Sequence, residues 1–316
     1  MGTFEVIQPG PLTTIQDLGR YGYQQYGVPV SGTMDSYAMR VANLLVGNNQ
    51  EAAGLEITLL GLKLRLLEDT VVAITGADLS PLLNNKPLPM WATVAVSSGA
   101  TISFQWPKRG CRSYLAVAGG IDIPKVMGSS STYVKSQLGG VEGRPLRAGD
   151  HLNSGQAQPG ILARKLPPQY VIEYRNQNEL RVILGPQDDY FTKKGIHDFL
   201  HSEYTISAEA DRVGYRLQGP RIEHKAGADI ISDGIPQGAI QVPGDGLPIV
   251  LMADRQTTGG YAKIATVITV DIQKLAQAKP GDKVRFLQIT GEEAHQALIE
   301  HEQTIDTLKH YLQQNH

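Results

Sequence analysis

The sequence of 316 residues lacks several features that would place a protein in a class at once. It holds a single cysteine, Cys111, which excludes an internal disulfide and any cysteine-based metal cluster. No run of about 18 apolar residues occurs, so we expect no transmembrane helix. The formal net charge of −2 gives no general attraction to nucleic acid or to an anionic membrane. These absences predict a soluble protein with neither nucleic acid nor a membrane among its partners.

Several catalytic motifs are missing as well. The chain has no G-x-x-x-x-G-K-S/T loop for nucleotide phosphates, no G-x-S-x-G nucleophile elbow and no H-E-x-x-H zinc motif. His197 and His201 have helical spacing without a third ligand nearby, so we expect no metal site. Cys111 has no neighbouring histidine to form a thiolate, which predicts a small buried thiol. The first ten residues resemble no signal peptide, and we expect a cytoplasmic protein.

Short apolar runs are abundant, and 34 glycines and 18 prolines punctuate them. Each run has the length of a strand, is rich in leucine or β-branched residues, and is bounded by turn formers. Many short strands separated by glycine and proline indicate a barrel or a sandwich, so the predicted fold class is mainly β. The predicted strands are 55–60, 62–67, 70–74, 92–96, 101–106, 114–118, 180–184, 246–252, 265–270 and 283–289.

Three helices are predicted. The first covers residues 35–46, because Asp35 is a good N-cap, apolar residues recur on one face, and Gly47 ends the pattern. The second covers residues 190–201 and follows a pair of aspartates suited to a first turn. The third is an amphipathic helix in the C-terminal tail, residues 291–316.

The length of the chain exceeds the usual limit of a single core, so we expect two domains. A polar, proline-bearing segment at residues 153–170 has the composition of a linker. The turn-and-strand segments Ser97–Phe104 and Lys279–Phe286 are similar, which favours a duplicated β domain. The expected division is an N-terminal β-barrel domain at 1–155, a C-terminal β-barrel domain at 170–290 and a helical tail at 291–316.

The segment Gly10–Asp35 is polar and carries only scattered aliphatic residues. Such a stretch is not expected to form a core, so it is interpreted as a long loop. Asp17, Arg20 and Asp35 alternate there with five glycines, which let the backbone approach a ligand. Long loops in compact domains are often functional, so a site loop is favoured over a plain surface loop.

Four segments in the C-terminal half share one composition: a carboxylate, arginine or glutamine beside glycine at a strand end. In a barrel, side chains at strand ends and loops converge on a common mouth. We therefore predict that Asp254–Tyr261 is a loop lining such a mouth, with a purely structural turn as the alternative. The four segments are Gly185–Phe191, Glu209–Gly219, Ser232–Gly246 and Ala253–Tyr261.

A family resemblance rests on these same motifs. The stretches "TTIQDLGRYGYQQYGVPVSGTMD", "ANLLVGN", "RSYLAVAGGI", "DRVGYRLQG" and "GAIQVPGDGLPIVLMADRQTTGGYAKIATV" occur in order between Phe4 and Phe286. The chain thereby resembles the allophanate hydrolase subunit 2 (KipA) family, the biotin-dependent carboxyltransferase domain family. The resemblance implies tandem cyclophilin-like β-barrel domains.

The resemblance also implies a function. Fused members form the carboxyltransferase part of urea carboxylase. Free-standing bacterial members similar to this chain are the C subunit of ATP-dependent 5-oxoprolinase, which hydrolyses 5-oxo-L-proline to L-glutamate. The implied partners are a KipI-like B subunit and a LamB/YcsF-like A subunit, and the chain alone is expected to be inactive. KipA and KipI are also described as a regulator pair for a sporulation kinase.

The sequence helps to choose among these branches. None of the six methionines is followed by lysine, so no biotin is attached to this chain. The complex is expected to use ATP, and the identity of the ATP-binding subunit stays open. The length of the chain, without a fused carrier or biotin carboxylase, favours the separate C subunit of 5-oxoprolinase. A component of a biotin-dependent carboxyltransferase and a KipA-type regulator that binds a KipI-like kinase inhibitor remain alternatives.

Lactam hydrolysis sets the chemistry expected of the site. It needs a donor or cation near the developing charge on oxygen and a carboxylate to orient water or take a proton. The candidate bases are Asp35, Asp211 and Asp254. The candidate substrate-binding residues are Arg20, Arg212, Gln237, Gln241, Arg255, Thr257, Thr258, Gly259, Gly260 and Tyr261. The alternative for Asp-Arg neighbours such as Asp211 and Arg212 is a structural ion pair.

Overall fold

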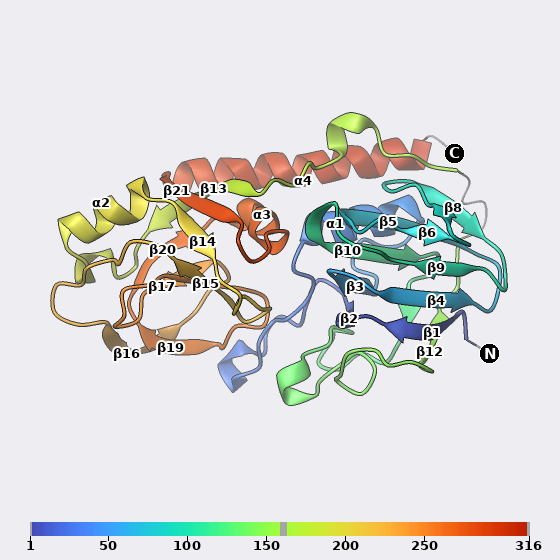
Figure 1. Ribbon diagram of the computed structural model, residues 1–316, viewed down its shortest axis with the longest axis horizontal. Helices are drawn as coiled ribbons and strands as arrows, with labels where there is room; N and C mark the ends of the chain where they lie inside the picture. The colour runs from blue at the N-terminus through green and yellow to red at the C-terminus, as the bar shows by residue number, and fades with distance from the viewer. Residues whose placement is uncertain (1, 159–162, 315–316) are drawn as a thin grey trace. The chain divides into compact units, whose positions relative to one another are not determined.

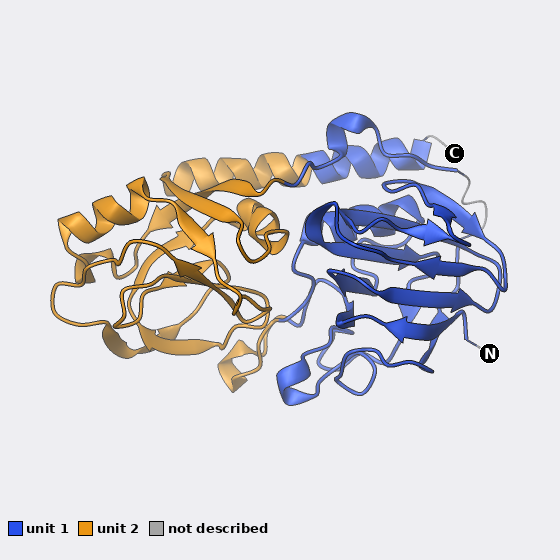
Figure 2. Ribbon diagram, in the orientation of Figure 1, with its two compact units in different colours: residues 1–20, 31–174, 304–316 blue, residues 21–30, 175–303 orange. Residues whose placement is uncertain are grey.

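The computed structural model describes residues 2–158 and 163–314 and is mainly β, as predicted (Figure 1). The chain divides into two compact units (Figure 2). Unit 1 comprises residues 1–20, 31–174 and 304–316, and unit 2 comprises residues 21–30 and 175–303. The predicted domain limits of 1–155, 170–290 and 291–316 stay a prediction.

Unit 1 contains two antiparallel sheets. The five-stranded sheet has the order β2 (Leu12–Gln16), β3 (Gly54–Thr58), β10 (Arg109–Val117), β5 (Thr70–Asp78) and β8 (Thr93–Val96). The seven-stranded sheet has the order β11 (Ile121–Asp122), β12 (His151–Ser154), β1 (Phe4–Pro9), β4 (Leu62–Leu66), β9 (Thr101–Ser103), β6 (Leu82–Leu83) and β7 (Lys86–Pro87).

The core of unit 1 follows from alternation along these strands. In β4 the three leucines are buried, whereas Lys63 and Arg65 between them are exposed. Leu64 and Leu66 join the same apolar cluster as Ile15 of the other sheet. Each fully buried side chain of this kind contributes about 1.5–3 kcal/mol, and replacing a buried leucine by alanine costs about 2–5 kcal/mol.

Helix α1 (Ser36–Leu45) confirms the first predicted helix. Asp35 is its N-cap, and its Oδ1 accepts a hydrogen bond from the Ala38 N–H at 3.0 Å. Gly47 follows the C-terminus with φ of 72°, a conformation that favours glycine. The buried face of α1 lies in one apolar cluster with Ile305, Leu308 and Leu312 of α4 (Gly291–Gln314), which confirms a helix in the tail.

Unit 2 contains a closed barrel, which confirms the predicted barrel architecture. The barrel closes because β21 pairs in parallel with β13 and antiparallel with β14. A separate ribbon pairs β16 (Asp229–Gly234) with β19 (Thr258–Tyr261). The strand order of the barrel is β13 (Gln177–Leu184), β20 (Lys263–Val267), β17 (Ala239–Gln241), β18 (Ile249–Leu251), β15 (Gly214–Gln218), β14 (Tyr204–Ile206) and β21 (Lys283–Gln288).

The helices of unit 2 outside α4 are short. Helix α2 (Lys193–His201) begins three residues later than predicted, because Thr192 is the N-cap and accepts from the Gly195 N–H at 2.9 Å. Helix α3 (Ile272–Ala276) was not predicted. Single 3₁₀ turns occur at Gln24–Tyr26, Val134–Ser136, Pro168–Tyr170, Asp188–Tyr190 and Thr269–Asp271.

Every predicted strand range overlaps a strand, but two loop predictions need correction. The segment Gly10–Asp35 is not one long loop, because Leu12–Gln16 forms β2 and Ile15 is in the core. Of the predicted loop Asp254–Tyr261, the last four residues form β19. In both cases pairing with a strand distant in sequence satisfies the backbone of a polar segment. In the predicted linker at 153–170, residues 159–162 lie outside the described residues.

Candidate functional site

The predicted site residues divide between the two units. Arg20 and Asp35 belong to unit 1, and all the others belong to unit 2. We call the set Asp17, Arg20, Ser129, Ser130 and Ser131 in unit 1 the serine clamp. We call the set Arg212, Gln241, Asp254, Arg255 and Lys263 in unit 2 the ribbon cluster, after the nearby β16–β19 ribbon.

Asp17 is the centre of the serine clamp and is only 6% exposed. Its carboxylate accepts hydrogen bonds from the hydroxyls of Ser129 at 2.6 Å and Ser131 at 2.5 Å. It also accepts from the backbone N–H groups of Ser130 at 2.6 Å and Gly19 at 2.8 Å. A buried carboxylate with these donors ties the chain after β2 to the serine loop.

Arg20 lies inside unit 1 and is 1% exposed. Its Nη2 donates to the Ser131 carbonyl at 2.6 Å and its Nε donates to the Val126 carbonyl at 3.4 Å. A Cβ on Gly139, where φ is 65°, would lie 2.1 Å from the Ser131 carbonyl oxygen and 2.7 Å from Nη2 of Arg20. Glycine is therefore required there, and the guanidinium holds the loop by its backbone.

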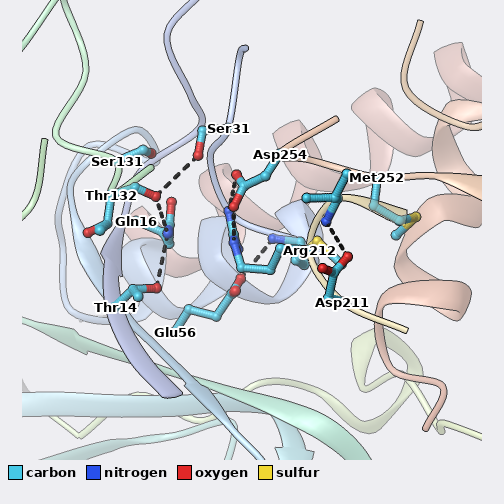
Figure 3. A network of polar contacts seen from close by, with 12 residues as sticks. Thr14, Gln16, Ser31, Glu56, Ser131, Thr132, Asp211, Arg212, Met252 and Asp254 are labelled. Carbon is cyan, nitrogen blue, oxygen red and sulfur yellow. Dashed lines mark hydrogen bonds and ion pairs between the residues drawn. The ribbon is translucent and has the colours of Figure 1, made fainter. Parts of the chain in front are cut away.

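Gln16 beside the clamp was missed from the sequence. It is fully buried, and its Nε2 donates to Thr14 Oγ1 at 3.0 Å and to the Thr132 carbonyl at 3.1 Å. The Ser31 hydroxyl donates to the same Thr132 carbonyl at 3.2 Å (Figure 3). Oε1 of Gln16 has no hydrogen-bond partner among residues 2–158 and 163–314. No local pattern marks a glutamine at the end of a strand as buried.

Asp35 is fully buried and connects α1 to a cluster of tyrosines. Besides capping α1, it accepts a hydrogen bond at Oδ2 from the Tyr174 hydroxyl at 2.8 Å. Its backbone N–H donates to the Tyr114 hydroxyl at 2.9 Å, and that hydroxyl donates to Glu56 Oε2 at 2.9 Å. Burial, and next the Asp35 charge, raise the pKa of Tyr174. The candidate base Asp35 therefore also has a structural role as the N-cap of α1.

In unit 2 the structure brings Arg212 and Asp254 together in a bidentate ion pair (Figure 3). The distances are 2.8 Å from Nε to Oδ2 and 3.0 Å from Nη2 to Oδ1. The residues are 5% and 6% exposed. Asp211 is exposed instead, and its Oδ1 accepts from the backbone N–H groups of Val213 and Gly214 in a turn. Of the two neighbours, Arg212 and not Asp211 lies inward.

Arg255 is also buried, at 7% exposure. Its Nε donates to the Ile235 carbonyl at 2.9 Å and its Nη1 donates to the Met252 carbonyl at 3.2 Å. Burial lowers the pKa of Arg255, against an opposite effect of Tyr21. These two bonds fix the guanidinium beside Ile235. Gln237, two residues after Ile235, is half-buried.

Gln241 ends β17 and is 2% exposed. Its Nε2 donates to the Tyr261 carbonyl at 3.3 Å. A Cβ on Gly259 would lie 2.9 Å from that Nε2, so a side chain at 259 would displace the amide. Tyr261 is 42% exposed, Thr258 is exposed, and Thr257 and Gly260 are half-buried. The outer residues of β19 are therefore the ones that a ligand on this surface could touch.

Lys263 is a member of the ribbon cluster that was missed from the sequence. It is 1% exposed and is the register partner of Gln241. Its Nζ donates to Asp233 Oδ2 at 2.7 Å and to the Gly234 carbonyl at 3.2 Å. The lysine lies between Ala262 and Ile264 in an apolar run, and this position in the sequence was the signal that could have identified it as a buried lysine. Because this lysine is buried and paired with Asp233, it supports the ribbon, and the accessible hydroxyl and amide groups of unit 2 are the ones that could bind a ligand.

The described part of the chain was compared with two further kinds of feature, clusters of metal-binding side chains and helices that could cross a membrane. Residues 2–158 and 163–314 contain no group of three or more His, Cys, Asp or Glu side chains able to hold a metal ion. None of the described helices is long and apolar enough to cross a membrane. Cys111 is a buried thiol that forms no disulfide with any described residue, and burial was predicted.

Comparison with known proteins assigns the family. The model of the family described as "Carboxyltransferase domain, subdomain A and B" matches residues 26–288. The chain is 40% identical over 293 residues to the C subunit of 5-oxoprolinase from Escherichia coli, covering 93% of each chain. It is 34% identical over 305 residues to the Haemophilus influenzae protein of the same name, covering 96% of this chain and 97% of the other.

A solved structure is similar as well. The crystal structure of Kluyveromyces lactis urea carboxylase matches with a TM-score of 0.89 and 33% identity over 96% of this chain. The match covers only 29% of that much longer protein. These findings confirm the resemblance carried by the motifs, and the chain belongs to the carboxyltransferase domain family of subdomains A and B.

Proposed function

We propose that this chain is the C subunit of an ATP-dependent 5-oxoprolinase that hydrolyses 5-oxo-L-proline to L-glutamate. The observation that carries the proposal is the 40% identity to the Escherichia coli protein of that name over 93% of each chain. The word "subunit" in that name supports a role within a hydrolase complex. The proposed partners are a KipI-like B subunit and a LamB/YcsF-like A subunit, and the proposed location is the cytoplasm.

The lactam of 5-oxoproline is an unstrained amide, so its hydrolysis needs activation. ATP would supply that activation in the complex, and the absence of a phosphate-binding loop motif here favours a nucleotide site on one of the partners. This chain would contribute donors that bind the lactam and its carboxylate as charge develops on oxygen. A biotin attached to this chain is not part of the proposal.

The role proposed for each predicted residue follows from whether its side chain is exposed or buried. The residues proposed to contact substrate are the accessible ones, Asp211, Gln237 and the segment Thr257–Tyr261. Asp211 is the only exposed carboxylate of the three candidate bases, so it is the proposed base. The buried residues are proposed to position the others: Arg20, Asp35, Arg212, Gln241, Asp254 and Arg255.

The test is reconstitution of the three-protein complex. The chain is purified alone and together with its proposed partners, and glutamate is measured after addition of 5-oxoproline and ATP. We expect glutamate from the three-protein complex and none from this chain alone. The Asp211→Asn variant is expected to assemble normally and to lower turnover about 100-fold, a typical contribution of general base catalysis. An assembled wild-type complex without ATP-dependent glutamate release would refute the proposal.

Biotin-dependent carboxyl transfer is the second candidate. The family description and the similarity to urea carboxylase favour it. Since no methionine precedes a lysine in this chain, the biotin would have to arrive on a separate carrier. Turnover would then require bicarbonate and a biotinylated carrier, and avidin would stop it. Avidin-insensitive glutamate release distinguishes the first function from the second.

A further inference from the structure

Strands β16 and β19 form a two-stranded ribbon in unit 2 (Figure 1), and β16 bulges out of it. Residues 230–232 of β16 lie opposite the single residue Gly260 of β19. A Cβ on Gly260 would lie 3.4 Å from the Ile230 carbonyl oxygen, so the bulged backbone lies close to this glycine. Bulges redirect side chains and are frequent beside active sites.

Ile231 is the residue that this bulge turns outward. Its side chain is 95% exposed, whereas Ile230 before it is half-buried. Among residues 2–158 and 163–314, the next most exposed large apolar side chain is that of Trp106, at 74%. Single exposed apolar residues are ordinary, but a side chain with so little contact to its own chain adds almost nothing to the stability of the fold. An isoleucine this exposed becomes buried only by contact with another molecule.

The bulge lies beside the segment proposed above to contact substrate. Because β16 pairs with β19, Ile231 lies across the ribbon from Thr257–Tyr261, of which Thr258 and Tyr261 are exposed. In an open site, bulk water would take the phosphoryl group from an activated lactam and restore the intact ring, so closure of the site favours ring opening. A molecule that covers this segment reaches Ile231 as well.

The exposed charges of the ribbon are mainly negative. Asp229 and Asp233 are exposed on β16. Gln187 Nε2 lies 3.5 Å from Asp233 Oδ2, and it brings the exposed Asp189 to the same surface. The buried Lys263 offsets part of the charge of Asp233, and the exposed Lys225 adds one positive charge. The surface around Ile231 is therefore acidic, and it complements a basic partner.

We propose that Ile231 is the anchor of a docking surface for a partner subunit, which presents an apolar recess rimmed by lysine or arginine. The isoleucine would fill the recess, and Asp229 would face the basic rim. The docked subunit would thereby close the segment Thr257–Tyr261 against water. This inference rests on the three-protein complex proposed above, and it adds where a partner binds and what its surface is like.

Surface plasmon resonance tests the proposal with the full chain immobilised and with the two proposed partners titrated separately and as a mixture. Ile231→Ser is expected to raise the Kd about tenfold or more, because it empties an apolar recess at the interface. Asp229→Lys is expected to lower the association rate about fivefold or more at low salt, and the difference should diminish at about 0.5 M salt.

Matched controls come from exposed residues of unit 1. Trp106→Ser removes an exposed apolar side chain, and Asp122→Lys reverses the charge of an exposed aspartate. Both are expected to leave the Kd within about twofold. Since Ile231 is 95% exposed, Ile231→Ser is expected to unfold at the same urea concentration as the unmodified chain. A loss of partner binding in that variant therefore reports on docking and not on folding.

The outcomes separate this proposal from the proposed function. An unmodified chain that binds neither partner nor their mixture refutes the three-protein complex, and the docking surface with it. Normal binding that Ile231→Ser leaves unchanged overturns the docking surface alone, and so does an equal loss in Trp106→Ser. Sedimentation of the chain by itself tests a second copy as the occupant. If Ile231→Ser abolishes self-association and spares partner binding, the proposal is overturned.

Discussion

The serine clamp and the ribbon cluster are both built from polar residues in glycine-bearing segments, yet they differ in what surrounds their charges. In the clamp, Asp17 and Arg20 are buried and bond to hydroxyls and backbone groups. In the ribbon cluster, buried charges such as Arg212 and Lys263 bond to carboxylates. Thr258 and Tyr261, exposed on β19, belong to the same unit.

The two regions are therefore suited to different roles. A carboxylate satisfied by neutral donors inside a fold contributes rigidity, and it has no group left to offer a ligand. A buried ion pair is less useful for stability, because desolvation offsets its attraction. Its presence near accessible hydroxyl and amide groups is better explained by positioning. The clamp is therefore interpreted as a scaffold and the ribbon cluster as the support of a site.

Two substitutions are expected to destabilise the fold by similar, large amounts, and the first is Asp17→Ala in unit 1. Removing the carboxylate leaves buried donors without an acceptor, so we expect a loss of about 3–5 kcal/mol in the free energy of unfolding. Both tryptophans, Trp91 and Trp106, belong to unit 1, so their fluorescence during urea unfolding reports on this unit.

Asp69→Ala is the matched control for Asp17→Ala. The Asp69 carboxylate also accepts a backbone hydrogen bond, from Ser98 at 2.8 Å, but at an exposed position. We expect it to cost less than about 1 kcal/mol. Equal losses for the two variants would remove the difference between a buried scaffold and an ordinary loop.

Arg212→Met tests the ion pair of the ribbon cluster. The substitution leaves the Asp254 carboxylate buried without its partner, so we expect a loss of about 3–5 kcal/mol in the free energy of unfolding. Urea unfolding monitored by circular dichroism measures this loss. Adding Asp254→Leu is expected to recover part of that loss, because both charges are then gone. Strictly additive losses would show that the two side chains do not act as a pair.

Tyr261→Phe tests whether the exposed side chains of β19 serve function rather than stability. If the Tyr261 hydroxyl binds substrate as proposed, its loss is expected to lower kcat/KM of the assembled complex about tenfold, or about 1.4 kcal/mol. The free energy of unfolding should change by less than about 0.5 kcal/mol, since the ring is 42% exposed. Tyr311 of α4, at 41% exposure and outside the predicted mouth segments, is the control, and Tyr311→Phe should leave turnover unchanged. A similar turnover in both variants would remove Tyr261 from the proposed site.

The smallest expected effect concerns a reference ion pair in unit 2, Arg181–Asp271, which lies outside the predicted site. Burial raises the pKa of Asp271, but hydrogen bonds from Arg181 and Lys274 lower it by more, to a net value below the ordinary one. The pair therefore contributes stability above an unfolded-state pKa of about 3.9, and this contribution is lost as the pH falls through the lower folded-state pKa.

Urea unfolding of unit 2 measures this dependence at about pH 7 and at about pH 3. We expect Asp271→Asn to lose stability at the higher pH and to show a smaller decrease on acidification than the unmodified chain. Parallel pH profiles for the two proteins would mean that the Arg181–Asp271 bonds do not stabilise the folded state. The same profile for Asp254→Asn then shows whether the ribbon pair behaves like this reference.

Local signals in the sequence predicted a large part of the fold. The apolar runs became strands because alternation and turn residues act within a few positions, as β4 shows. The cap at Asp35 placed the start of α1 for the same reason. The strand β2 was missed because its threonines and glutamine look polar, although pairing with β3 buries most of them. Site prediction had no local signal for burial, so Arg212 and Asp211 looked equivalent.

The mainly β class, the family and the presence of helices α1, α2 and α4 could all be inferred from the order of the residues alone. Which polar groups are buried became clear from the three-dimensional fold. Asp17 bonds to serines that are at least 112 residues away in the sequence, and Arg212 bonds to Asp254, which is 42 residues away. Local propensity depends on neighbours in the chain, whereas the environment of a charge depends on every segment that excludes water from it.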